Sequence, residues 1–67
     1  MNNQELINQL QRGDSVLITY DEDYNKMALV LDINENRILF QDTDGKFEFT
    51  KKYLMNSTLE LELIEED

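Results

Sequence analysis

The alternation of apolar and polar residues along the chain predicts a series of short strands organised around one apolar run. That run, residues 27–33, has apolar side chains in both of its alternate sets. In an extended strand, one face would carry Met27, Leu29, Leu31 and Ile33, and the other would carry Ala28 and Val30. A strand of this kind is either central in its sheet or covered on both sides, so we expect the rest of the chain to pack around it.

Four further segments alternate in the way that is typical of half-buried strands. They are residues 15–20, 37–42, 46–51 and 58–64. Their apolar faces would carry Val16, Ile18 and Tyr20 in the first, Ile38 and Phe40 in the second, Phe47 and Phe49 in the third, and Leu59, Leu61 and Leu63 in the fourth. These inward-facing residues are the predicted core of the sheet.

The segments between the strands are short and polar. We expect a loop at residues 21–25, a turn at 34–36 and an irregular connection at 52–57 that has room for one helical turn. The strongest hairpin signal is Asp42-Thr43-Asp44-Gly45, which predicts a type I turn closed by Gly45 with a positive φ. Residues 65–67 are all acidic and are expected to form a frayed tail.

Residues 2–11 have the pattern of a short helix that docks on the sheet. Its apolar stripe consists of Leu6, Ile7 and Leu10. Asn2 or Asn3 can cap its start, and Arg12 followed by Gly13 is typical of a helix C-terminus. About ten residues are marginal for an isolated helix, so this one should form only when its stripe packs against the sheet.

Together these elements predict a single domain, residues 1–67, with an α+β fold. A short N-terminal helix would precede a strongly bent five-stranded antiparallel sheet that forms a small barrel, or, as the alternative, an open sheet with the helix on one face. The order of elements resembles that of the SH3-like and Sm-like small barrels over nearly the whole chain. The Sm-like resemblance implies RNA binding through polar and basic loops. The corresponding loops of this chain instead carry Asp21, Glu22, Asp23, Asp42 and Asp44.

The length of the chain limits the stability that its core can supply. A chain of 67 residues buries only roughly 60% of its unfolded surface, and a core of this size rarely supplies more than about 3–5 kcal/mol without a disulfide or a metal. The sequence contains no cysteine and no histidine, so we expect neither a disulfide nor a zinc site. Self-association is the remaining way to add buried area, and we therefore expect a homodimer.

The chain is strongly acidic, with 15 Asp and Glu residues against 6 Lys and Arg residues and a formal net charge of −9. Direct binding to DNA, RNA or an anionic membrane is disfavoured, because those ligands require a basic footprint. A basic protein partner is favoured instead. No apolar run approaches the roughly 20 residues that span a bilayer, and the start of the sequence lacks the features of a signal peptide. We therefore expect a soluble, cytoplasmic protein.

Catalysis and metal binding are both disfavoured. His and Cys supply the commonest general base and the most reactive nucleophile, and neither is present. Two stretches, starting at Asp21 and Asp32, match the first five positions of a calcium-binding loop. The glycine required at the sixth position is Lys26 in one and Arg37 in the other. We expect a protein that is not an enzyme and that holds no cofactor or metal.

The carboxylates suggest a functional hypothesis. Alternate residues on one face of a strand are roughly 6.6–6.8 Å apart, so Glu60 and Glu62 would present a row of negative charge with a spacing comparable to that of a nucleic-acid backbone. Such a row can occupy a groove lined with Lys and Arg, although a solvated outer face is an equally favoured reading. The candidate partner contacts are Asp21, Glu22, Asp23, Asp42, Asp44, Glu48, Glu60 and Glu62.

In size, charge and lack of catalytic residues, the chain resembles the small acidic phage-encoded proteins that take over host functions by mimicking DNA. It most resembles the type that inhibits the nucleoid protein HU. This resemblance implies an acidic dimer that covers the DNA-binding surface of a basic host protein. Two alternatives remain open. One is a structural or scaffold module that uses aromatic contacts such as Tyr24 or Tyr53, and the other is Sm-like RNA binding through Lys46, Lys51 and Lys52.

Overall fold

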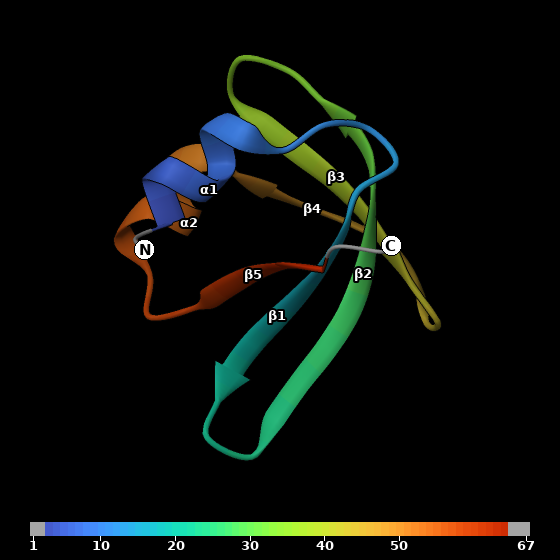
Figure 1. Cartoon of the computed structure of the whole chain (residues 1–67), viewed down its shortest axis with the longest axis vertical. Coiled ribbons are helices and arrows are strands. Elements are labelled where there is room, and N and C mark those ends of the chain that lie inside the picture. Colours follow the sequence, from blue (N-terminus) through green and yellow to red (C-terminus); the bar gives the residue numbers. More distant parts are fainter. Residues whose placement is uncertain (1–2, 65–67) are drawn as a thin grey trace.

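The computed structural model describes residues 3–64, which form an α+β fold with a five-stranded antiparallel sheet and two short helices (Figure 1). The elements in chain order are α1 (Asn3–Gln9), β1 (Ser15–Asp21), β2 (Tyr24–Ile33), β3 (Arg37–Asp42), β4 (Gly45–Thr50), α2 (Lys51–Asn56) and β5 (Glu60–Ile64). The strands lie in the order β4-β3-β2-β1-β5, and all neighbours are antiparallel. Within residues 3–64, β4 does not pair with β5. The sheet is therefore open, as in the second of the two predicted arrangements.

Strand β2 is central in the sheet, as its apolar run predicted, but only one of its faces is covered. Ala28 and Val30 are buried on the inner face, whereas 61% of Met27 and 40% of Leu29 is exposed on the outer face. The predicted grouping of Ile33 with Met27 and Leu29 is wrong. A shift in register between Val30 and Asp32 inserts an extra residue, and this bulge turns Ile33 toward the core.

The hydrophobic core lies between the helices and the inner face of the sheet, and Figure 1 shows α1 and α2 lying together on that side. Its buried members are Ile7, Leu10, Val16, Ile18, Ala28, Val30, Ile38, Phe40, Leu54 and Leu59. Partly buried against them are Tyr20, Ile33, Phe47, Phe49, Leu61 and Leu63. The apolar faces predicted for the four flanking strands are thus confirmed, and the stripe of the N-terminal helix is buried as expected.

Helix α1 ends at Gln9, two residues before the predicted end, and Asn3 lies inside it rather than capping it. The Asn3 side chain donates hydrogen bonds to the carbonyls of Leu54 (2.9 Å) and Leu59 (2.6 Å). These bonds attach the start of α1 to the segment that leads into β5. The alternative cap, Asn2, lies outside the described residues. The helix cap predicted at Gly13 is wrong: Gly13 has a positive φ of 91°, but it lies four residues beyond Gln9, in a turn closed by a hydrogen bond from the Asp14 amide to the Gln11 carbonyl (3.1 Å).

Three other boundaries differ from the prediction. Strand β2 begins at Tyr24, so the expected loop at 21–25 shrinks to a tight turn at Glu22 and Asp23. The connection at 52–57, expected to be irregular with room for one helical turn, forms the short helix α2, and the Thr50 hydroxyl caps it by accepting a hydrogen bond from the Tyr53 amide (3.0 Å). Strand β5 begins at Glu60 rather than at residue 58. The acidic tail predicted at 65–67 lies outside the described residues.

Candidate functional site

The eight carboxylates predicted as partner contacts fall into two groups. Five of them lie at one side of the sheet, and we call this group the acidic edge. It consists of Asp21, Glu22, Asp23, Glu60 and Glu62. Because β5 pairs with β1, with Glu60 opposite Thr19 and Glu62 opposite Leu17, the carboxylates of β5 lie next to the β1 strand that leads into the acidic turn. The structure thus brings together two segments that are almost forty residues apart in the sequence.

Two shallow hollows are bordered by four of the five members of the acidic edge, all except Asp23. One of about 330 Å³ is lined by Thr19, Tyr20, Asp21, Glu22, Thr58 and Glu60. A second, of about 370 Å³, is lined by Asn3, Thr19, Glu60, Leu61 and Glu62. Glu60 belongs to both, so the row on the strand and the carboxylates of the turn border a common surface. Within residues 3–64, no Lys or Arg forms an ion pair with any of the five carboxylates.

The local structure fixes the direction of the two strand carboxylates. Leu61 and Leu63 are packed against the core, so the alternation of the strand places Glu60 and Glu62 on the outer face. In the turn, an Asp21 carboxylate oxygen accepts a hydrogen bond from the Asp23 amide (2.9 Å), which holds the short chain reversal. The acidic edge is therefore a set of exposed charges on an ordered backbone.

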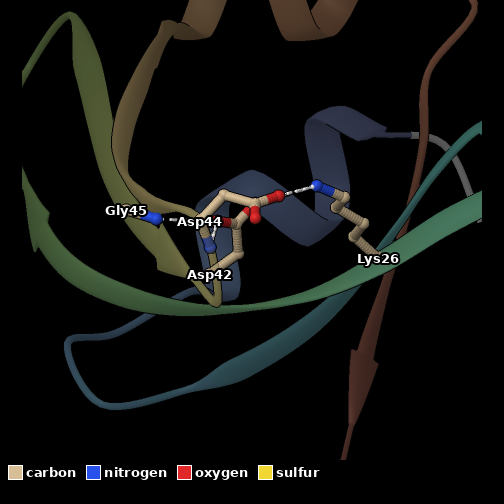
Figure 2. A network of polar contacts seen from close by, with 4 residues as sticks. All are labelled: Lys26, Asp42, Asp44 and Gly45. Carbon is tan, nitrogen blue, oxygen red and sulfur yellow. Dashed lines mark hydrogen bonds and ion pairs between the residues drawn. The ribbon is translucent and has the colours of Figure 1, made fainter.

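The other three predicted contacts, Asp42, Asp44 and Glu48, are ion-paired within the chain. The Lys26 ammonium pairs with the Asp44 carboxylate and lies 3.8 Å from an Asp42 oxygen, as Figure 2 shows for the β3–β4 turn. Glu48 pairs with Arg37 at 3.0 Å. Asp42 also accepts hydrogen bonds from the amides of Asp44 (2.7 Å) and Gly45 (3.2 Å), where Gly45 has the predicted positive φ. We call Lys26, Asp42 and Asp44 the paired turn.

The paired turn changes the ionisation of its members. The hydrogen bond with Asp44, followed by one with Tyr24, raises the pKa of Lys26, and the same hydrogen bond from Lys26 lowers the pKa of Asp44. The Lys26 ammonium lies 5.7 Å from the centre of the Tyr24 ring, and this ring lies tilted against Tyr20 with its centre 5.3 Å away. Burial raises the pKa of Tyr20, and Asp42 raises it further. Lys26 is thus held between two carboxylates and an aromatic face.

No feature of the sequence pattern indicates that Lys26 pairs with the β3–β4 turn. Lys26 and Asp44 are 18 residues apart, and they meet only because β2 begins early enough to lie beside the end of β3. A pattern of alternating apolar residues marks the middle of β2 but not its polar start. The position of the cation therefore depends on strand register, which the sequence pattern did not specify.

Apart from charge, the surface presents exposed aromatic and aliphatic side chains. Tyr24 and Tyr53 are each about half exposed, and each contacts a neighbouring ring: Tyr24 lies tilted against Tyr20, and Tyr53 stacks on Phe49 at 5.4 Å. Each tyrosine thus combines packing against a neighbouring ring with an exposed ring surface. On the outer face, Met27 lies opposite Leu17 in the β1–β2 pairing, and Leu29 follows it along the strand. These three residues form an apolar outer patch.

Among residues 3–64, no group of three acidic side chains is arranged to hold a metal ion. No helix there is long and apolar enough to cross a membrane. Comparison of the chain with protein-family models, with curated proteins and with solved structures gave no match. The function is therefore inferred from the chemistry of the surface.

Proposed function

We propose that this protein is an acidic DNA mimic that binds a basic nucleic-acid-binding protein and blocks its DNA-binding surface. The acidic edge is the contact surface. One observation is the main support for the proposal. The five carboxylates of this edge lie on neighbouring segments, and within residues 3–64 no cation pairs with them. In contrast, Asp42, Asp44 and Glu48 are ion-paired within the chain. Exposed carboxylates without cations are free to pair with the Lys and Arg of a partner.

Two physical effects would favour this binding: the release of counterions and the rigidity of the strand that carries the carboxylates. A DNA-binding groove carries Lys and Arg side chains placed to neutralise phosphates, and fixed carboxylates can occupy the same positions. Glu60 and Glu62 project from a strand that is anchored by Leu61 and Leu63, so little backbone freedom is lost on binding. Complementary charge also accelerates the encounter, especially at low salt.

The proposal includes a finer description of the fold and of the biological setting. The strand order and the short helix between β4 and β5 support an SH3-like or Sm-like small barrel. We place the protein with the phage-encoded host-takeover proteins that act in the host cytoplasm, with the nucleoid protein HU as an example of the basic target. The charge of −9 supports a basic target and disfavours direct binding to nucleic acid.

The test is capture of partners from bacterial lysate on the immobilised protein, at low and at high salt, followed by elution with duplex DNA. We expect recovery of a basic DNA-binding protein that DNA displaces and that high salt releases. Recovery of salt-resistant partners without a basic bias, or of no partner, would contradict the proposed mimicry. A bait with Lys at both positions 60 and 62 serves as the matched control, and we expect it to lose the DNA-displaced protein.

A second candidate, a scaffold module, is favoured by the apolar outer patch of Leu17, Met27 and Leu29. Exposed apolar side chains grouped on one face are typical of a protein contact, and a second copy of the chain is the partner that we expect there. Light scattering should give the mass of a dimer, and Met27→Gln with Leu29→Gln should reduce it to that of a monomer. A monomeric mass for the unmodified protein would eliminate the dimer.

A further inference from the structure

The two strands at the ends of the open sheet present very different edges. The β4 edge carries Lys46, and Lys51, the α2 residue that directly follows β4, donates a backbone hydrogen bond to the Asn36 carbonyl of the β2–β3 turn (2.7 Å). The β5 edge has no lysine, no proline and no bulge in its register with β1. Natural sheets protect their edges with such features. Charge on Glu60 and Glu62 is therefore the main feature that protects the β5 edge from an added strand.

Charge prevents β5 from pairing with β5 of a second copy. Its sequence alternates Glu and Leu, so an antiparallel pair that matches leucine with leucine also places Glu60 and Glu62 opposite the same carboxylates of the other chain. Like charges placed directly opposite one another destabilise a strand pair. The alternation thus permits strand addition only by a chain of different charge.

Strand β4 of a second copy also pairs poorly with the β5 edge. If Lys46 of one chain lay opposite Glu62 of another in an antiparallel pair, Glu48 would fall opposite Glu60. One attraction would be offset by one repulsion. A strand that carries Lys or Arg at both alternate positions would satisfy both glutamates, because residues opposite each other in a pair lie on the same face.

We infer that β5 is a docking edge for an extended basic segment of the partner, with Lys or Arg alternating with apolar residues. This inference rests on the proposed function and names the part of the partner that is recognised. The backbone of the segment pairs with β5, its cations lie over Glu60 and Glu62 on the outer face, and its apolar residues cover the half-buried Leu61 and Leu63 on the inner face. Backbone pairing gives affinity, and the alternation gives specificity.

The hollows beside β5 support this mode of binding. Both are lined by Glu60, one of them together with Asp21 and Glu22 of the β1–β2 turn. A cation opposite Glu60 would therefore also approach the carboxylates of the turn. The strongest contact is expected at that end of β5, where strand and turn combine their charge.

Synthetic peptides test the inference on the full chain. A short peptide in which lysine and valine alternate should bind about tenfold more tightly than a peptide of the same composition with its lysines and valines in separate blocks. N-methylation of alternate backbone amides, which removes strand hydrogen bonds without changing charge, should abolish this advantage. Hydrogen exchange should slow at Glu60–Ile64 when the alternating peptide binds.

Matched variants locate the site. Glu60→Gln with Glu62→Gln should weaken binding of the alternating peptide about tenfold, whereas Glu35→Gln with Glu48→Gln, which removes the same charge elsewhere, should change it less than about twofold. Equal binding of the two peptides, no effect of N-methylation, or protection at β4 or at the outer patch would overturn the inference. Concentration-dependent protection of β5 in the free protein would also overturn it, by showing that a second copy occupies the edge.

The outcome is distinguishable from that of the proposed function. If a basic protein is captured and displaced by DNA but β5 amides in the complex exchange as in the free protein, the docking mode is wrong and the mimicry stands. If the alternating peptide binds β5 as expected but no DNA-displaced protein is captured, the edge binds basic strands and the mimicry is wrong.

Discussion

The acidic edge and the paired turn are both built from carboxylates near hairpin turns, yet they use their charge in opposite ways. In the paired turn, Lys26 lies against two carboxylates, and the Asp42 carboxylate also organises the chain reversal. At the acidic edge, the strand carboxylates have no partner within residues 3–64, and only Asp21 accepts a backbone hydrogen bond. Charge that is paired internally contributes to folding, and charge that is left unpaired is available to a partner. Composition alone does not separate the two.

The largest expected effect is on the affinity for the basic partner, and it shows whether the position of the carboxylates or only the net charge determines binding. One double variant carries Glu60→Lys and Glu62→Lys at the acidic edge. The other carries Asp44→Lys and Glu48→Lys at two ion-paired positions. Both double variants change the net charge by the same amount. Affinity for the captured basic protein should fall at least about tenfold for the first pair and less than about threefold for the second. Circular dichroism serves to check that both variants are folded. Equal losses would mean that net charge alone determines binding.

A smaller effect is expected on stability, and it should appear when the paired turn is changed. Lys26→Met leaves Asp42 and Asp44 without their cation, so the midpoint of urea unfolding should fall. Lys46→Met removes the same charge from an exposed position on β4 and is the matched control, for which we expect little change. Loss of stability in the control equal to that in Lys26→Met would indicate a general effect of net charge.

Removing the strand charges of the acidic edge should leave stability almost unchanged. Glu60→Gln with Glu62→Gln alters exposed side chains that have no partner within residues 3–64, so the free energy of unfolding should change by less than about 0.5 kcal/mol. Urea unfolding of this variant beside the wild type measures the change. A marked loss of stability would show that these carboxylates support the fold, contrary to the comparison.

The pH dependence of the free energy of unfolding should show the contribution of the paired turn. The pKa of Lys26 is raised above its ordinary value of 10.5, so its contribution is fully present below about pH 10.5 and is lost as the pH rises further. The pKa of Tyr20 is raised in the same direction, which adds to the alkaline loss. The pKa of Asp44 is lowered from 3.8, so its contribution is present above that pH and is lost as the pH falls.

Urea midpoints measured across the pH range test these directions. Lys26→Met should flatten the alkaline decline, and Asp44→Asn should flatten the acid decline. An unchanged alkaline limb in Lys26→Met would contradict the role assigned to the ion pair.

The sequence predicted what depends on local pattern. Alternation identified the inward faces of the strands, as with Ile38 and Phe40, and the Asp-Gly signal located the β3–β4 turn with its positive φ at Gly45. It also identified Glu60 and Glu62 as an outward row. In each case the information lies within a few neighbouring residues, where side-chain direction and backbone preference are directly encoded.

What the sequence could not predict depends on pairing between distant segments. The bulge before Asp32 shifts Ile33 to the core, and no turn residue or change of alternation marks it. Helix α2 is too short to show a helical period, so the sequence pattern predicts only an irregular connection with room for one helical turn there. Strand order and register bring β5 next to the acidic turn and Lys26 next to Asp44. Both depend on the packing of the whole sheet, so local sequence patterns do not reveal them.

Carbodiimide labelling of carboxylates, read by mass spectrometry in the free protein and in its complex with the captured basic protein, tests the central claim most directly. The account predicts that labelling of Glu60, Glu62 and the Asp21–Asp23 turn falls in the complex, while labelling of Asp44 and Glu48 stays as in the free protein. Protection of Asp44 and Glu48 with continued labelling of Glu60 and Glu62 would contradict the assignment of the acidic edge as the binding surface.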